Sequence, residues 1–252
     1  MLAGMFATKE EVMKRLFLVS ALFLGTWVVQ PAVSGAQPLS PVGSWGVVIS
    51  GADRGTSMMT FSNDLSVSGY GIMRKQFGLF TLTGHWGFDT NGNVVVAYLQ
   101  SLNGVDTAVS FTARVQHSGK FRAKGTGTGG GLQFRGAVVS DFPDLSGSWS
   151  AAVKRHGKTL HETYHIAAST NFPAVFDVTG DGLSDTGSFT LLGTVIATSH
   201  NQLNVSIDRT FGVDTQRSSL YGRFKPAKPE MALKGVDDTD AHLTIKAVLD
   251  GP

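Results

Sequence analysis

The chain has 252 residues, of which 21 are lysine or arginine and 19 are aspartate or glutamate, so its formal net charge is +2. This near balance excludes the strongly basic composition that is typical of nucleic-acid-binding proteins, and we expect no nucleic-acid partner. Cysteine is absent, which excludes disulfides and thiol chemistry. We therefore expect a fold that relies on its apolar core alone.

The first 36 residues have the parts of a secretory signal peptide. Lys14 and Arg15 precede an apolar run at residues 16–29, and Ser34 and Ala36 place small residues at the −3 and −1 positions of a cleavage site. The run is too short to span a bilayer, and no later stretch is better suited. We predict cleavage after Ala36, a periplasmic or secreted location in a bacterium, and no transmembrane segment afterwards. An uncleaved N-terminal anchor is the alternative.

The rest of the chain contains one pattern twice. Four landmarks recur in the same order at nearly constant offsets: Gly43-Ser44-Trp45 as Gly147-Ser148-Trp149, Phe80 to Gly84 as Phe189 to Gly193, Phe121 as Phe224, and residues 132–139 as residues 243–249. A repeat of about 100 residues has the size of a whole domain. We predict two modules, at residues 37–140 and 147–252, joined by a linker that contains Pro143.

Each module has the pattern of short β-strands. Phe80, Leu82, Trp86 and Phe88 alternate with threonines and His85, which is typical of a half-buried strand. Asn91-Gly92 then predicts a hairpin turn. The first module has eight predicted strands: residues 45–50, 57–61, 66–73, 80–88, 94–99, 109–115, 121–126 and 132–139. This spacing predicts an all-β fold of two tandem antiparallel barrel-like modules, each closed from about eight strands.

Both modules resemble the calycin barrels, which are the lipocalins, the avidins and their small relatives. The resemblance rests on a Gly-x-Trp motif in the first strand and a basic residue in the last, here Trp45 with Arg135 and Trp149 with Lys246. It implies that each tryptophan closes one end of a barrel and that the basic side chain packs across it. It also implies a small apolar ligand inside a barrel. The set of tryptophans that contacts biotin in avidins is missing.

The predicted inward-facing residues of the first module give the candidate ligand site: Phe80, Leu82, Trp86, Phe88, Tyr98 and Phe134. A barrel of eight strands is wide enough either to be filled by its own side chains or to hold one small ligand. We therefore expect an exported, non-enzymatic protein that binds a small apolar or amphipathic molecule. A structural or surface-interaction module with filled barrels is the alternative.

His161-Glu162-Thr163-Tyr164-His165 matches the H-E-x-x-H signature of zinc hydrolases. That chemistry needs a helix, on which the two histidines share one zinc and the glutamate activates water. The alternation of Leu160, Glu162, Tyr164 and Ile166 with polar residues favours a strand instead. On a strand the two histidines lie roughly 13 Å apart. A zinc-dependent hydrolase is therefore the less favoured alternative function.

The segment from Asp177 to Asp185 resembles a calcium-binding loop. Asp177, Thr179, Asp181 and Asp185 offer oxygen ligands at positions 1, 3, 5 and 9, and Gly182 is placed for a sharp turn. Position 12 lacks the glutamate of an EF-hand. We predict calcium as the one metal cofactor, with an ordinary hairpin turn as the alternative.

Overall fold

The computed structural model describes residues 38–250, except residues 76, 128, 129, 140, 141, 186, 199 and 200. The predicted signal peptide and its cleavage site lie outside these residues, so export stays a prediction. Within the described part of the chain, no helix is long and apolar enough to cross a membrane.

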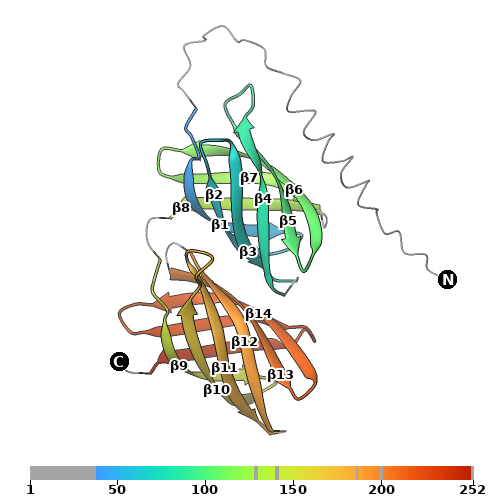
Figure 1. The fold of residues 1–252 in the computed structure, drawn as a ribbon, viewed down its shortest axis with the longest axis vertical. Helices are drawn as coiled ribbons and strands as arrows, with labels where there is room; N and C mark the ends of the chain where they lie inside the picture. The colour runs from blue at the N-terminus through green and yellow to red at the C-terminus, as the bar shows by residue number, and fades with distance from the viewer. Residues whose placement is uncertain are drawn as a thin grey trace, which may run out of the picture. The chain divides into compact units, whose positions relative to one another are not determined.

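The chain forms two tandem closed barrels of eight antiparallel strands each, which confirms the predicted fold class (Figure 1). The first barrel consists of β1 (Gly43–Gly51), β2 (Gly55–Phe61), β3 (Ser66–Met73), β4 (Leu79–Phe88), β5 (Val94–Leu102), β6 (Val105–Gln116), β7 (Lys120–Gly127) and β8 (Gly130–Val138). The second consists of β9 (Gly147–Arg155), β10 (Lys158–Ala168), β11 (Val175–Ser184), β12 (Gly187–Ala197), β13 (Gln202–Phe211), β14 (Asp214–Lys225), β15 (Glu230–Asp237) and β16 (His242–Leu249).

Each barrel closes because its first strand pairs with its last. Trp45 of β1 faces Val138 of β8, and Trp149 of β9 faces Leu249 of β16. All other neighbours along each sheet are consecutive in sequence. Closure pairs the backbone groups that an open sheet would leave exposed at its edges.

Three of the four sequence landmarks fall on equivalent strands of the two barrels. The exception is Phe121, which lies on the seventh strand of its barrel, whereas Phe224 lies on the sixth. Their predicted equivalence is wrong, and the register instead equates Phe121 with Met231: Phe121 faces Gly136 of the last strand, and Met231 faces Ala247. The two phenylalanines nevertheless contact the equivalent tryptophans, Trp45 and Trp149.

Inside both barrels, a phenylalanine lies flat over a glycine of the neighbouring strand. Phe80 of β4 faces Gly71 of β3, and Phe189 of β12 faces Gly182 of β11. A Cβ atom at either glycine would lie 2.3 Å from Cζ of the ring. The ring therefore occupies the volume that a side chain would need, and at Gly71 the carbonyl oxygen of Thr56 would also lie 2.5 Å from the Cβ atom. This explains why glycine stands in the middle of these strands.

We predict that Gly71→Ala and Gly182→Ala each lower the free energy of unfolding by about 1–3 kcal/mol, because the new methyl group forces the ring out of its place. Chemical denaturation of the purified variants measures this change. Gly131→Ala is the matched control, since a Cβ there meets nothing within 4 Å. Equal effects at all three glycines would contradict the account.

Candidate functional site

The interior of the first barrel is filled by its own side chains. Phe80, Leu82, Trp86, Tyr98 and Phe134 of the predicted ligand set are each at most 5% exposed and belong to one apolar cluster. Phe88 alternates in step with Phe80, Leu82 and Trp86, as predicted. It lies at the end of β4, however, and is 43% exposed, in edge contact with Trp86.

Aromatic rings outside the predicted ligand set complete this core. Phe111 lies at its centre, with ring centroids 4.5 Å from Phe134, 5.9 Å from Phe121 and 6.4 Å from Tyr98. Phe121 continues the contact to Trp45, at 5.2 Å. The rings therefore pack on one another across the barrel, and the aromatic set serves as its core.

One end of each barrel is closed by a tryptophan and the segment before it. The indole Nε1 of Trp45 donates to the carbonyl of Pro41 at 2.6 Å, and that of Trp149 donates to Leu145 at 2.9 Å. Both acceptors lie four residues before the tryptophan. Leu145 is fully buried in the core of the second barrel. Each preceding segment is therefore held as a plug.

The expected basic partners of these tryptophans are not in place. Arg135 and Lys246 both point to the outer face of their barrels, whereas the two tryptophans point inward. The barrel that the calycin resemblance implies is confirmed, but its pairing of tryptophan with a basic side chain is wrong. The physical reason is that successive side chains of a strand point to opposite faces. Arg135 and Lys246 alternate with core residues on their strands and therefore point outward.

The H-E-x-x-H segment lies on strand β10, as its alternation predicts. His161 and His165 point outward, and Glu162 is buried inside the barrel. The two imidazoles and the carboxylate therefore lie on opposite faces of the sheet and do not form the zinc-hydrolase arrangement. Within the described residues, no three histidine or acidic side chains are grouped so that they could hold a metal ion.

The predicted calcium loop is wrong in conformation, because most of it forms strand β11. Asp177, Thr179 and Asp181 project from its outer face at intervals of about 7 Å, and Asp185 lies in the following turn. Asp185 pairs with Lys158 instead. The four ligands do not surround one point. Calcium binding as such stays a prediction.

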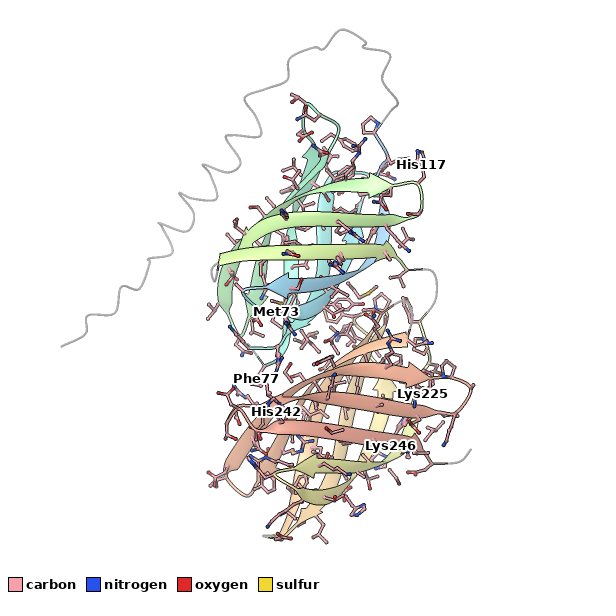
Figure 2. All side chains as sticks on the ribbon, turned by 180° about the vertical axis from the view of Figure 1, so that it is seen from behind. Met73, Phe77, His117, Lys225, His242 and Lys246 are labelled. Carbon is pink, nitrogen blue, oxygen red and sulfur yellow. The ribbon has the colours of Figure 1, made fainter. Side chains whose placement is uncertain are left out.

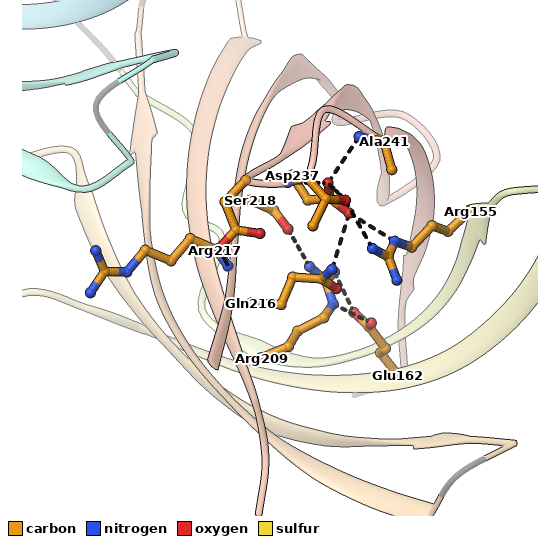
Figure 3. Close-up of polar contacts among 10 residues, drawn as sticks. Arg155, Glu162, Arg209, Gln216, Arg217, Ser218, Asp237 and Ala241 are labelled. Carbon is orange, nitrogen blue, oxygen red and sulfur yellow. Dashed lines mark hydrogen bonds and ion pairs between the residues drawn. The ribbon is translucent and has the colours of Figure 1, made fainter. Parts of the chain in front are cut away.

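The second barrel contains a buried charged network, whereas no charged side chain is buried among the described residues of the first barrel. Arg209 is 2% exposed, and its Nε and Nη2 donate to the two carboxylate oxygens of Glu162 at 2.7 and 3.0 Å (Figure 3). Its Nη1 donates to Ser218 Oγ at 2.7 Å, and Tyr164 donates its hydroxyl hydrogen to Glu162 at 2.5 Å. Burial and the adjacent carboxylate raise the pKa of Tyr164 well above its usual value. The tyrosine therefore stays a donor.

A second network lies near the end of the barrel opposite the Trp149 plug. The Asp237 carboxylate is fully buried and accepts hydrogen bonds from Arg155 Nε at 2.8 Å and Gln216 Nε2 at 3.2 Å. It also accepts from the backbone N–H groups of Thr239 and Ala241, each at 2.9 Å. Burial works to raise the pKa of Asp237, but these hydrogen bonds and the Arg155 charge outweigh it and lower the pKa. The carboxylate is therefore ionised and holds Arg155 in place.

A depression of about 690 Å³ opens at this end of the second barrel. Leu160 and Phe211 are its partly buried apolar residues, and they pack against the barrel core. Polar and charged residues from four hairpins complete it: Arg155, His156, Lys158, Ser184, Asp185, Asp214, Thr215, Gln216, Asp238 and Thr239. The depression therefore combines an apolar floor with a hydrogen-bonding rim, which suits an amphipathic molecule.

Another depression, of about 620 Å³, lies on the outer face of the second barrel. Its lining includes three residues of the predicted metal motifs, His161, Glu162 and Asp181, and small residues such as Ser150 and Thr163. His165, Asp177 and Asp185 do not line it.

No protein-family model matches the chain, and no curated protein matches it. Two solved structures that it is similar to are redesigned β-barrels. One shares 17% identity over 42% of this chain and 92% of the other, with a TM-score of 0.38. The second, described as bound to DFHBI, shares 14% identity over 42% of this chain and 94% of the other, with a TM-score of 0.37.

We predict that Glu162→Gln lowers the free energy of unfolding by about 3–5 kcal/mol, because it leaves the Arg209 charge buried without its counter-ion. Urea denaturation of the variant measures the loss. The triple variant Glu162→Leu, Arg209→Met, Tyr164→Phe removes the whole set of partners and should recover most of the stability. A loss below about 1 kcal/mol in Glu162→Gln would mean that water reaches the pair.

Proposed function

We propose that the protein binds a small amphipathic molecule at the open end of the second barrel. One observation carries this proposal: the depression above Leu160 and Phe211 combines partly exposed apolar side chains with a rim of oriented polar groups. The Trp149 plug closes the opposite end. A molecule that enters the barrel therefore arrives at the β9–β10 and β13–β14 hairpins.

The two parts of such a ligand have different partners in the depression. Its apolar part covers Leu160 and Phe211, which removes their remaining surface from water. Its polar part reaches Arg155 and Gln216, whose side chains are held by Asp237. Donors that are already fixed lose little conformational freedom on binding, which favours affinity.

The first barrel supports the other function that the sequence left open, a filled interaction module. Its aromatic side chains pack on one another, and Phe80 and Phe134 are fully buried. A ligand inside it would have to displace this core. We therefore assign small-molecule binding to the second barrel and give the first a role through its surface.

We predict that anilinonaphthalene sulfonate, an amphipathic dye that brightens in apolar surroundings, binds the protein at this depression. Phe211→Ser should weaken that binding about tenfold or more, because it removes apolar contact area. Fluorescence titration measures the affinity.

The matched control is Leu102→Ser. Leu102 occupies the equivalent position in the first barrel, because Thr81 faces Ser101 as Thr190 faces Thr210. It is also partly buried against its own core. An equal loss in Leu102→Ser, or a dye that binds both variants as it binds the unchanged protein, would refute the assignment to the second barrel.

A further inference from the structure

The small net charge of the chain conceals an uneven distribution between the barrels. Residues 38–139 contain eight lysines and arginines and four acidic residues, a balance of +4. Residues 147–250 contain ten basic and eleven acidic residues, a balance of −1. The excess positive charge therefore belongs to the first barrel.

Five of its eight basic side chains lie on one outer face, formed by β6, β7 and β8. We call this the basic face, and its residues are Arg114, Lys120, Arg122, Lys124 and Arg135. All five are exposed. Within the described residues, none of them forms an ion pair. His117, labelled in Figure 2, marks the β6–β7 hairpin at one end of this face.

Three arginines of the basic face form one row across the strands. Arg114 faces Arg122, and Arg122 faces Arg135. Directly opposed side chains on neighbouring strands lie about 5 Å apart, and like charges there are destabilising. The acidic residues of this barrel are Asp53, Asp64, Asp89 and Asp106. Among the described residues, none of them forms an ion pair with the arginines of the row, so no ion pair offsets the repulsion there.

The second barrel shows that the fold does not need this row. At the equivalent positions, Arg223 faces Ala232, and Ala232 faces Lys246. Alanine replaces the central arginine, and Lys246 lies 3.4 Å from the carboxylate of Glu230. The central position thus tolerates an uncharged residue, so the fold does not require the arginine at the centre of the row.

We propose that the basic face binds a flexible acidic polysaccharide, a chain that carries carboxylate or sulfate groups. Arginine and lysine pair well with both groups, and arginine can do so through two hydrogen bonds. Beside the row, Lys120, Arg122 and Arg135 line a depression. Its other lining residues include the small residues Gly136 and Ala137 and, from the second barrel, Thr198 and Gln202. An anionic group of the polymer can therefore approach the guanidinium groups closely.

The shape of the face favours this partner over other polyanions. The outer surface of a closed eight-stranded barrel is curved, so the side chains of Arg114 and Arg135 diverge on the two sides of Arg122. A flexible chain follows this curvature, whereas a flat lipid surface or a stiff DNA duplex meets only part of it. No aromatic side chain lies among the outward residues of β6, β7 and β8. Single-stranded nucleic acid would need one for base stacking.

The test is a binding titration of the full chain with heparin and with polygalacturonate. We expect binding that weakens steeply with salt, because the polymer releases counter-ions when it binds. The triple variant Arg114→Gln, Arg122→Ala, Arg135→Gln should lose at least tenfold in affinity. The matched control, Lys154→Gln, Arg223→Gln, Lys228→Gln, removes the same charge from the second barrel and should leave the affinity within about twofold.

Thermal melts separate loss of binding from loss of folding. Arg122→Ala alone should raise the melting temperature by about 1–3 °C, because it removes two like-charge contacts. The proposal is overturned if neither polysaccharide binds, or if the control variant loses as much affinity as the arginine variant. Tighter binding to duplex DNA or to phosphatidylglycerol vesicles would overturn it too.

Discussion

The narrow interior of a closed eight-stranded barrel is the constraint on which the rest of this structure depends. Such a barrel has room for its own side chains or for one small ligand. The inward residues of each strand therefore determine whether the barrel interior is a packed core or a ligand-binding site. In the first barrel they are large and aromatic, with Phe111 in contact with Phe134, Phe121 and Tyr98. In the second they include the buried pair of Glu162 and Arg209.

The two barrels place polar side chains at the same two interior positions. Trp45 faces Met59 as Trp149 faces Tyr164, so Ser57 is the equivalent of Glu162. By the same register, Gln100 is the equivalent of Arg209, and all four residues are buried. A duplicated frame thus carries two neutral polar side chains in one copy and an ion pair in the other. The charged copy is also the one whose open end is lined by Arg155, which the buried Asp237 holds in place. This supports a division of roles between the copies.

The spacing of the strands and the alternation of apolar and polar residues predicted the barrels, because the number of strands and their apolar faces determine whether a sheet can close. The alternation also placed Glu162 on the apolar side of its strand, and Arg209 has the same parity as Leu203 and Ile207. A charged residue at an inward position was thus a readable signal of the buried pair. The link between them, 47 residues apart, depends on strand order and register. The spacing of the oxygen donors gave the wrong geometry for residues 177–185. On a strand, donors two residues apart lie about 7 Å from one another and do not converge on one ion.

The central claim is that the first barrel is filled and that a ligand reaches the second barrel at its open end. A crystal structure of the protein with a bromine-labelled long-chain alcohol tests it directly, because the anomalous signal locates the bromine. The account predicts bromine in the depression above Leu160 and Phe211, with the rings of the first barrel undisturbed. Bromine between Phe80 and Phe134, inside the first barrel, would contradict it.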